Sequence, residues 1–374
     1  MIDLAAQRLT SAGYSRARLS RPAKAANATP SVSVVIPSYN YGAYLPACVA
    51  SVLGQEGVHL EVLIVDDRST DGSGEVAESL ATADRRVRVH HNPRNLGHIA
   101  TYNLGFSLVS GEYVLLVSAD DMLTPGAISR AVTLLEACPS VGFAYGWSLP
   151  FVEGEQLPRA RLRTRSWSVW HGEDWVADRC RRGCNVIRSS DALVRRSVLD
   201  EVGGYRADLP HSGDFEWWMR AALVADVGMV CGVDQLYYRL HGANMSRTTY
   251  ASTSINLRAT RDAFEAALAD GGPRSANRVA LLDVAHQTLA RVAVELATVE
   301  FMSASPDSVA IADYKGFARA TYPAITQSRQ WRALARREKA GGTGARRNPA
   351  FRATEVARDL RAKAQWRRWR FSGI

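Results

Sequence analysis

Cysteine is scarce in this chain of 374 residues, which contains only five. Their odd number and scattered positions argue against a disulfide framework. Cys180 and Cys184 are separated by three residues, but no second cysteine or cysteine–histidine pair completes a zinc site, and His171 alone gives weak support. We therefore interpret the thiols as structural or incidental.

Long hydrophobic runs are also absent. No stretch approaches the ~18 apolar residues of a membrane-spanning helix, and the longest runs, such as Val114–Val117, have the length of a strand. Residues 1–30 lack the apolar segment of a secretory signal, so we expect a cytoplasmic protein. With 47% hydrophobic and 22% charged residues, the composition excludes a wholly disordered chain, a collagen and a coiled-coil fibre.

Acidic residues are few at both ends of the chain, and the net charge of the whole is +9. Residues 328–374 contain 14 lysines and arginines against three acids, and residues 1–30 contain five against one. The remaining residues 31–327 are therefore mildly acidic, with a net charge of −6. Basic ends of this kind indicate an anionic partner, either lipid headgroups or nucleic acid.

The first half of the chain alternates between short apolar runs and segments with helical spacing. Strands are predicted at 31–37, 61–65, 87–90 and 113–117. Helices are predicted at 44–53 and 103–109, and from Thr124-Pro125 onward. Residues 69–73 have N-cap chemistry and predict a further helix that follows them and ends at about Leu80. This alternation indicates an α/β fold with a parallel sheet covered by helices on both faces.

The pattern changes after residue 146. Residues 159–175 are basic and rich in tryptophan, which we interpret as loop and short strand over the ligand site. The later segments are a helix at 215–224, a strand at 229–236, a loop at 237–246, alanine-rich helices from 255 to 309 and a basic helix at 351–371. We predict a basic leader at 1–30 (mostly irregular or a poorly packed helix), an α/β domain at 31–250, a helical extension at 251–340 and a basic amphipathic tail at 341–374.

Polar clusters directly follow three of the predicted strands, where ligands of parallel sheets bind. The clusters are Pro37–Asn40, Asp66-Asp67 and Asp120-Asp121. Two adjacent buried carboxylates repel each other unless a cation neutralises them. A divalent ion such as Mg²⁺ or Mn²⁺, shared with a diphosphate, would do so at Asp120-Asp121. The alternative for this pair is a solvated turn or a helix cap.

Asp66-Asp67 has two interpretations as well. The pair could hydrogen-bond a base or ribose, as acids do in nucleotide crevices, or it could cap the following helix. Neither a glycine-rich dinucleotide loop nor a P-loop lysine motif follows the first strand. Hydride transfer and phosphoryl transfer by those two routes therefore lose support.

Six separated motifs together resemble the family 2 glycosyltransferases, which are inverting enzymes with the GT-A fold. They occur in the family's order and spacing, over roughly residues 31–250. The motifs are Val34–Asn40, Ile64–Ser73, Asn95–Gly97, Gly111–Asp121, Gly213–Arg220 and Tyr238–Ser246. The resemblance implies a GT-A-type, Rossmann-like and mostly parallel sheet, and transfer of a sugar from a nucleoside-diphosphate sugar to an acceptor hydroxyl.

The family's donor-binding roles carry over to four positions. By this resemblance the backbone of Pro37, the side chain of Tyr39 and the carboxylate of Asp67 would bind the base, and Asp120 would contact the ribose. In the same way Asp121 would ligate a divalent metal, Mn²⁺ or Mg²⁺, on the diphosphate.

The remaining roles fall on the second half of the α/β domain. By resemblance His241 would assist the metal or the diphosphate, although it could equally be a satisfied loop histidine. Asp214 would be the general base, at the start of a helix whose dipole would keep it ionised, with Glu216 as the second choice. Trp217 and Trp218 could stack on a sugar, although aromatic residues on a helix face more often belong to the core.

The basic tail mixes charged residues such as Arg361, Lys363 and Arg367 with aromatic residues such as Trp366 and Trp369. This mixture suits a helix on an anionic membrane surface; a solvated or disordered tail is the alternative. No nucleic-acid reader motif accompanies the charge, so we expect no nucleic-acid partner. We expect a peripheral enzyme on the inner face of the cell membrane that builds a cell-envelope or secreted glycan on a glycan or lipid-linked acceptor. The alternative is an inactive nucleotide-sugar-binding scaffold.

Overall fold

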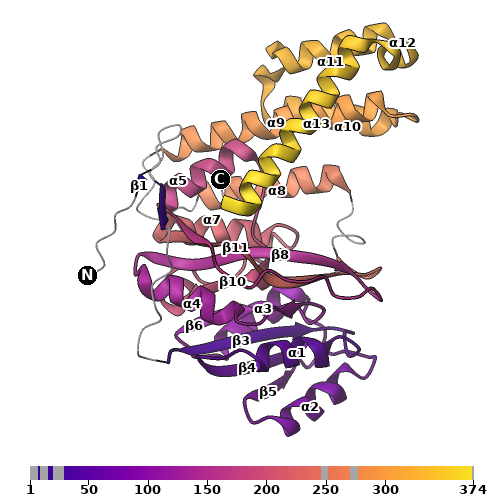
Figure 1. Cartoon of the computed structure of the whole chain (residues 1–374). Coiled ribbons are helices and arrows are strands. Elements are labelled where there is room, and N and C mark those ends of the chain that lie inside the picture. The colour runs from indigo at the N-terminus through magenta and orange to yellow at the C-terminus, as the bar shows by residue number, and fades with distance from the viewer. Residues whose placement is uncertain (1–6, 9–15, 20–28, 246–251, 270–276, 373–374) are drawn as a thin grey trace.

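The structure is a computed structural model of the chain, and it describes residues 7–8, 16–19, 29–245, 252–269 and 277–372. One mixed sheet forms its centre (Figure 1). The strand order is β1-β2-β9-β11-β8-β10-β6-β3-β4-β5, with β7 paired to β11. Helices cover both faces, so the predicted α/β fold with a Rossmann-like sheet is confirmed.

Four neighbouring strands form the parallel part of the sheet. They are β3 (Ser31–Ser38), β4 (His59–Asp66), β5 (Val87–His91) and β6 (Tyr113–Leu116). The connecting helices are α1 (Leu45–Leu53), α2 (Ser73–Ala83), α3 (His98–Ser107) and, after β6, α4 (Ala127–Ala137). All four strands were predicted, because a strand that is buried on both faces is a continuous apolar run.

Alternate side chains of β3 point into two different cores. Val32, Val34 and Ile36 pack in the core with α1, α2 and α4, whereas Val35 packs in the core that contains Ile99 of α3. This period of two fixes the register of the strand, because a slip by one residue would exchange the two faces. The carboxyl ends of β3, β4 and β6 therefore emerge side by side at one edge.

The second half of the sheet contains antiparallel pairs. β10 (Ala192–Arg195) is antiparallel to both β6 and β8 (Val141–Val152), and β8 pairs in parallel with β11 (Asp226–Leu240). β9 (Ser166–Trp170) and β7 (Met122–Leu123) are antiparallel to β11. The sequence analysis did not predict β10, whose four residues are too short for a periodic signal.

Residues 172–182 differ from the loop-and-strand interpretation of 159–175. They form helix α5 (Gly172–Arg182), which buries Trp175 and Val176 and ends at Gly183 with a φ of +64°. The short strand of that interpretation is β9. The many arginines of α5 hid its buried apolar stripe, so that the helix was missed.

Two helices of the α/β domain, α6 (Arg196–Val202) and α7 (Gly213–Val224), precede β11. The extension then contains α8 (Thr253–Ala269), α9 (Arg278–Met302), α10 (Ser308–Thr321) and α11 (Arg329–Ala340), with a 3₁₀ turn at Pro323–Gln327. Phe264 of α8 meets Phe215 of α7 edge to face, with ring centroids 5.0 Å apart. The core of the extension is thus continuous with that of the α/β domain.

The tail returns to the α/β domain. After Gly341 a short helix, α12 (Gly342–Arg347), leads through Asn348 to α13 (Pro349–Ser372). In Figure 1, α13 runs from α12 back toward β11 and α7. Trp366 of α13 packs against Trp147 of β8, with ring centroids 5.3 Å apart. Within the described residues, no helix is both long and apolar enough to cross a membrane.

Two short segments of the predicted leader are strands. β2 (Arg16–Leu19) pairs antiparallel with β9, and β1 (Gln7–Arg8) pairs with β2. For these segments the interpretation as irregular chain or a poorly packed helix was wrong, because they add to the free edge of β9. The rest of residues 1–28, and Ser246 of the predicted late loop, lie outside the described residues.

Candidate active site

A cavity of about 560 Å³ opens at the carboxyl ends of β3, β4 and β6. Five residues singled out in the sequence line it: Pro37, Tyr39, Asp67, Asp120 and Asp121. The structure therefore brings the three polar clusters together, as expected for strand ends of a parallel sheet. His241 and Asp214 are not among the residues that line this cavity.

The Asp67 carboxylate organises the loop before α3. Its Oδ1 accepts hydrogen bonds from Asn92 Nδ2 (2.8 Å) and from the backbone N–H of Leu96 (2.7 Å), and its Oδ2 accepts one from the N–H of Gly97 (2.9 Å). Helix α2 begins at Ser73, and no side-chain hydrogen bond caps its N-terminus at the N-cap position. Neither acid of the 66–67 pair is therefore the cap of this helix. Within the described residues Oδ2 has one acceptor position left, on the wall of the cavity.

Asp120 and Asp121 are buried, with 6% and 2% of their surfaces exposed. The solvated-turn interpretation of this pair is therefore wrong. Asp121 Oδ1 accepts the backbone N–H of Arg239 (3.1 Å), and Arg239 Nε donates to the Asp120 carbonyl oxygen (2.9 Å). Burial first, and then the neighbouring charge of Asp120, raise the pKa of Asp121 well above its ordinary value.

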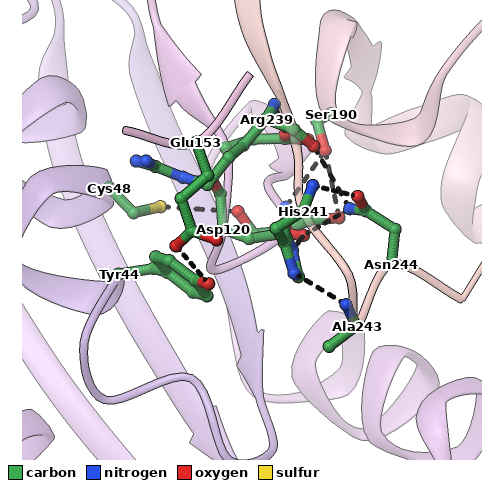
Figure 2. A network of polar contacts seen from close by, with 11 residues as sticks. Tyr44, Cys48, Asp120, Glu153, Ser190, Arg239, His241, Ala243 and Asn244 are labelled. Atoms are coloured by element: carbon green, nitrogen blue, oxygen red, sulfur yellow. Dashed lines mark hydrogen bonds and ion pairs between the residues drawn. The ribbon is translucent and has the colours of Figure 1, made fainter. Parts of the chain in front are cut away.

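His241 lies beside Asp120 (Figure 2). Its Nε2 is 2.9 Å from Asp120 Oδ2, to which Asn244 Nδ2 also donates at 3.3 Å. The N–H of Ala243 donates to Nδ1 of the imidazole (3.2 Å), which assigns the proton of the neutral ring to Nε2 and directs it at Asp120. His241 is thus a buried, bonded histidine, and its partner is Asp120 rather than Asp121.

Asp214 is the second residue of α7. Its Oδ1 accepts the N–H of Phe215 (2.7 Å), and its Oδ2 accepts Asn185 Nδ2 (3.0 Å). Burial outweighs these two hydrogen bonds and raises the pKa of Asp214 to about 6. The helix start therefore does not keep this carboxyl as acidic as the sequence analysis expected.

The other acid of α7 has a structural role. Glu216 is fully buried, and both of its oxygens accept hydrogen bonds from Arg220 (Nε to Oε1 at 2.6 Å, Nη2 to Oε2 at 3.0 Å). It is therefore unavailable as the second-choice base. Trp217 and Trp218 are each 2% exposed, and Trp217 Nε1 donates to the Gly203 carbonyl (2.7 Å), which confirms that they are core residues.

Comparison with known proteins identifies the family. Residues 33–203 match the family model described as glycosyl transferase family 2. The chain is 41% identical over 232 residues to the glycosyltransferase GlyG of Streptococcus pneumoniae, a match that covers 59% of this chain and 74% of the relative. The chain belongs to the family 2 glycosyltransferases. It is therefore an enzyme that transfers a sugar. A second relative, an uncharacterised glycosyltransferase of Haemophilus influenzae, is 27% identical over 59% of this chain and 68% of its own length.

Solved structures share the fold of this glycosyltransferase. TarS (residues 1–349) of S. aureus, in complex with UDP-GlcNAc, superposes with a TM-score of 0.54 at 16% identity, over 79% of this chain and 92% of that one. The mannosyltransferase PcManGT of Pyrobaculum calidifontis, in complex with GDP-Man and Mn²⁺, superposes with a TM-score of 0.52 at 16% identity, over 90% and 87%. At this identity the likeness supports the GT-A fold alone.

The residues of the glycosyltransferase fit a divalent ion that is shared with a substrate. Within the described part of the chain, no group of three or more histidine, cysteine, aspartate or glutamate side chains could hold a metal ion by itself. The adjacent buried carboxylates of Asp120 and Asp121 nevertheless supply the hard oxygen ligands that Mg²⁺ and Mn²⁺ prefer. Such ions commonly use one or two carboxylates together with substrate phosphates.

Sequence reasoning missed several polar residues of this site. Asn185 orients Asp214, Asn244 contacts Asp120, and Ser190 Oγ accepts the N–H of Ser118 (3.0 Å). Asn244 lies inside the late-loop motif, which could have suggested it. Asn185 and Ser190 precede the unpredicted strand β10, so nothing in their local sequence placed them near the other residues.

Proposed function

We propose that this glycosyltransferase transfers a sugar from a nucleoside-diphosphate sugar to an acceptor hydroxyl, with inversion at the anomeric carbon. One observation carries the proposal. A buried carboxylate pair, Asp120-Asp121, lines a cavity at the strand ends, and a separate oriented carboxylate, Asp214, has a pKa of about 6. The first arrangement suits a metal-bound diphosphate, and the second suits a general base.

The donor base would lie against Pro37, Tyr39 and Asp67. Tyr39 is 46% exposed on the cavity, which makes its ring available for stacking, and Asp67 Oδ2 retains an acceptor position for a base N–H. TarS and PcManGT were solved with UDP-GlcNAc and GDP-Man, two nucleoside-diphosphate sugars. These ligands support a donor of the same chemical class for this enzyme.

Asp121 would ligate a divalent ion, Mn²⁺ or Mg²⁺, and Asp120 would contact the ribose. The ion would act as a Lewis acid that neutralises the charge on the diphosphate. Its binding would also offset the charge of Asp120, which, after burial, is the second cause of the raised pKa of Asp121. His241 would assist the metal or the diphosphate after its contact with Asp120 opens.

Asp214 would remove the proton of the acceptor hydroxyl. Asn185 Nδ2 and the N–H of Phe215 occupy one position on each oxygen and fix the carboxylate, so that the remaining lone pairs have a defined direction. A positioned general base typically contributes ~10²–10⁴-fold to the rate. Direct attack by the activated hydroxyl in a single displacement inverts the anomeric carbon.

The tail supports a location at an anionic membrane. Helix α13 exposes Arg361, Lys363 and Arg367 together with the apolar side chains of Val356 and Leu360. Each basic residue near such a surface contributes about 1 kcal/mol. An acceptor that is a lipid-linked or envelope glycan would be presented at this surface.

Donor turnover tests the proposed reaction against an inactive scaffold. Purified enzyme is incubated with Mn²⁺ and a panel of UDP-, GDP-, dTDP- and CDP-sugars, and release of the nucleoside diphosphate is measured with and without lipid-linked acceptor extract. We expect release from at least one donor, and release that is slower by ~10²-fold or more from the Asp214→Asn variant. Donor binding without any release from the wild-type enzyme would favour the scaffold.

A further inference from the structure

One short segment of the chain connects the two carboxylate groups of the site. Asn185 Nδ2 donates to Asp214 Oδ2 at 3.0 Å. Five residues later, Ser190 Oγ accepts the N–H of Ser118 at 3.0 Å, at the start of the loop that carries Asp120 and Asp121. Five residues span at most ~18 Å even when fully extended. The proposed base and the loop of the proposed metal ligand are thus held by the two ends of one short segment.

Arg188 occupies the middle of this segment. Its guanidinium carbon lies 3.8 Å from the centroid of the Tyr238 ring, and Tyr238 lines the cavity. The side chain is exposed, and within the described residues no carboxylate lies at ion-pair distance from it. Arg188 is thus a cation at the cavity rim, positioned by a ring rather than by an acid.

The acidic side chains around the cavity favour a cation beside it. Asp67, Asp120 and Asp121 line it, whereas the lining contains no lysine or arginine from the described chain. Arg188 also acts electrostatically on the predicted base, since its charge opposes the rise in pKa that burial causes at Asp214.

Arg239, the other arginine of this region, is already engaged. Its Nε donates to the Asp120 carbonyl at 2.9 Å, and its guanidinium lies 4.9 Å from the Tyr44 ring and 4.8 Å from the Phe151 ring. It stabilises the loop around Asp120 in this position. Within the described residues, no hydrogen bond occupies the guanidinium N–H groups of Arg188, so they can bind a ligand.

We propose that Arg188 is a catalytic residue that binds the β-phosphate of the donor and stabilises the leaving diphosphate. This inference rests on the proposed function. In the transfer, the acceptor oxygen forms a bond to the anomeric carbon, and the bond from that carbon to the phosphate oxygen breaks. The electron pair of the broken bond stays on the phosphate, and the acceptor proton goes to Asp214. The guanidinium donates two hydrogen bonds to the phosphate and loses no proton.

Nucleotides that differ by one phosphate test the assignment. Calorimetry measures the binding of UDP, UMP, GDP and GMP, all with Mn²⁺. The wild-type enzyme is compared with Arg188→Ala, Arg188→Lys and the control Arg85→Ala. Arg85 is an exposed arginine in the turn before β5. We expect Arg188→Ala to lower the affinity for the diphosphate that binds the wild-type enzyme by about tenfold or more. Its affinity for the matching monophosphate should change less than twofold, and Arg188→Lys should lie between.

The outcomes separate this inference from the function on which it rests. Equal losses for diphosphate and monophosphate, or no loss for either, would overturn the role of Arg188 while the proposed function stands. A wild-type enzyme that binds no nucleoside diphosphate, with ADP, CDP and dTDP added to the panel, would overturn both. A thermal unfolding curve of Arg188→Ala that matches the wild type excludes misfolding, and Arg188→Gln replaces it if the curves differ.

Discussion

The imidazole Nε2 of His241 lies 2.9 Å from Oδ2 of Asp120, 121 positions earlier in the chain. Both side chains are buried, with 1% and 9% of their surfaces exposed, and the rings of Tyr41 and Tyr44 enclose the imidazole. The pair joins the end of β11 to the loop after β6. A ribose that binds Asp120 as proposed would compete with this bond.

The Asp121→Asn variant should lose metal-dependent binding without loss of stability. The amide can still accept the N–H of Arg239, and it removes a buried charge that repels Asp120. We expect Mn²⁺ to stop raising the affinity for UDP or GDP, while the midpoint of thermal unfolding stays equal or rises. Calorimetry with and without Mn²⁺ measures the first effect, and unchanged metal dependence would refute the assignment of Asp121.

The Asp214→Asn variant should bind donor and metal but transfer slowly. The amide keeps the volume of the side chain but cannot accept the proton of the acceptor. We expect kcat to fall by ~10²-fold or more, with the donor affinity within about twofold of the wild type. Asp208→Asn is the matched control, because Asp208 is an exposed acid in the loop before α7 and pairs with Arg206 (3.0 Å). Near-normal transfer by Asp214→Asn would contradict its role as base.

The pH profile should report the raised pKa of Asp214. Its carboxyl has a pKa of about 6, and only the ionised form accepts a proton. With saturating donor and Mn²⁺, kcat/KM for the acceptor should therefore fall below pH 6, roughly tenfold for each further unit, and level off above pH 7. Steady-state rates between pH 4.5 and 8 measure this. A profile that is flat down to pH 5 would exclude Asp214 as the titrating base.

Two helical glycines should respond to alanine in opposite directions. A Cβ on Gly105 of α3 would lie 2.3 Å from Val35 Cγ1, whereas a Cβ on Gly316 of α10 has no neighbour within 4 Å. Gly105→Ala should lower the free energy of unfolding by about 1–3 kcal/mol through overpacking. Gly316→Ala should raise it by about 0.5–1 kcal/mol through helix propensity. Urea unfolding curves measure both, and equal signs would contradict the close packing of α3 on β3.

Charge reversal on α13 should reduce binding to anionic vesicles. The triple variant Arg361→Glu, Lys363→Glu, Arg367→Glu changes exposed residues, so the fold should be retained. We expect at least a tenfold loss of affinity for vesicles with anionic lipid, and unchanged donor hydrolysis in solution. The control reverses the same number of exposed charges elsewhere, at Arg85, Arg332 and Lys339. Equal vesicle binding by the two triple variants would reject α13 as the membrane surface.

The parallel strands were predictable because each is buried on both faces and therefore stands out as an apolar run. The site was predictable to the extent that its residues follow those strands, as Asp67 and Asp120 do. The contact between Asp120 and Asn244 was not, because 124 positions separate them and local spacing carries no information on such pairs. Arg188 was missed for the same reason, since its position depends on β10, an antiparallel strand of four residues.

The packing of Trp366 on Trp147 would also make the proposed attachment of α13 to a membrane depend on the contact between α13 and β8. A bilayer that takes up the Trp366 ring must first separate it from β8, the strand whose Phe151 pairs with Arg239 of β11. By linkage, whatever stabilises the contact between Trp366 and Trp147 would weaken the proposed membrane binding of that ring by the same factor.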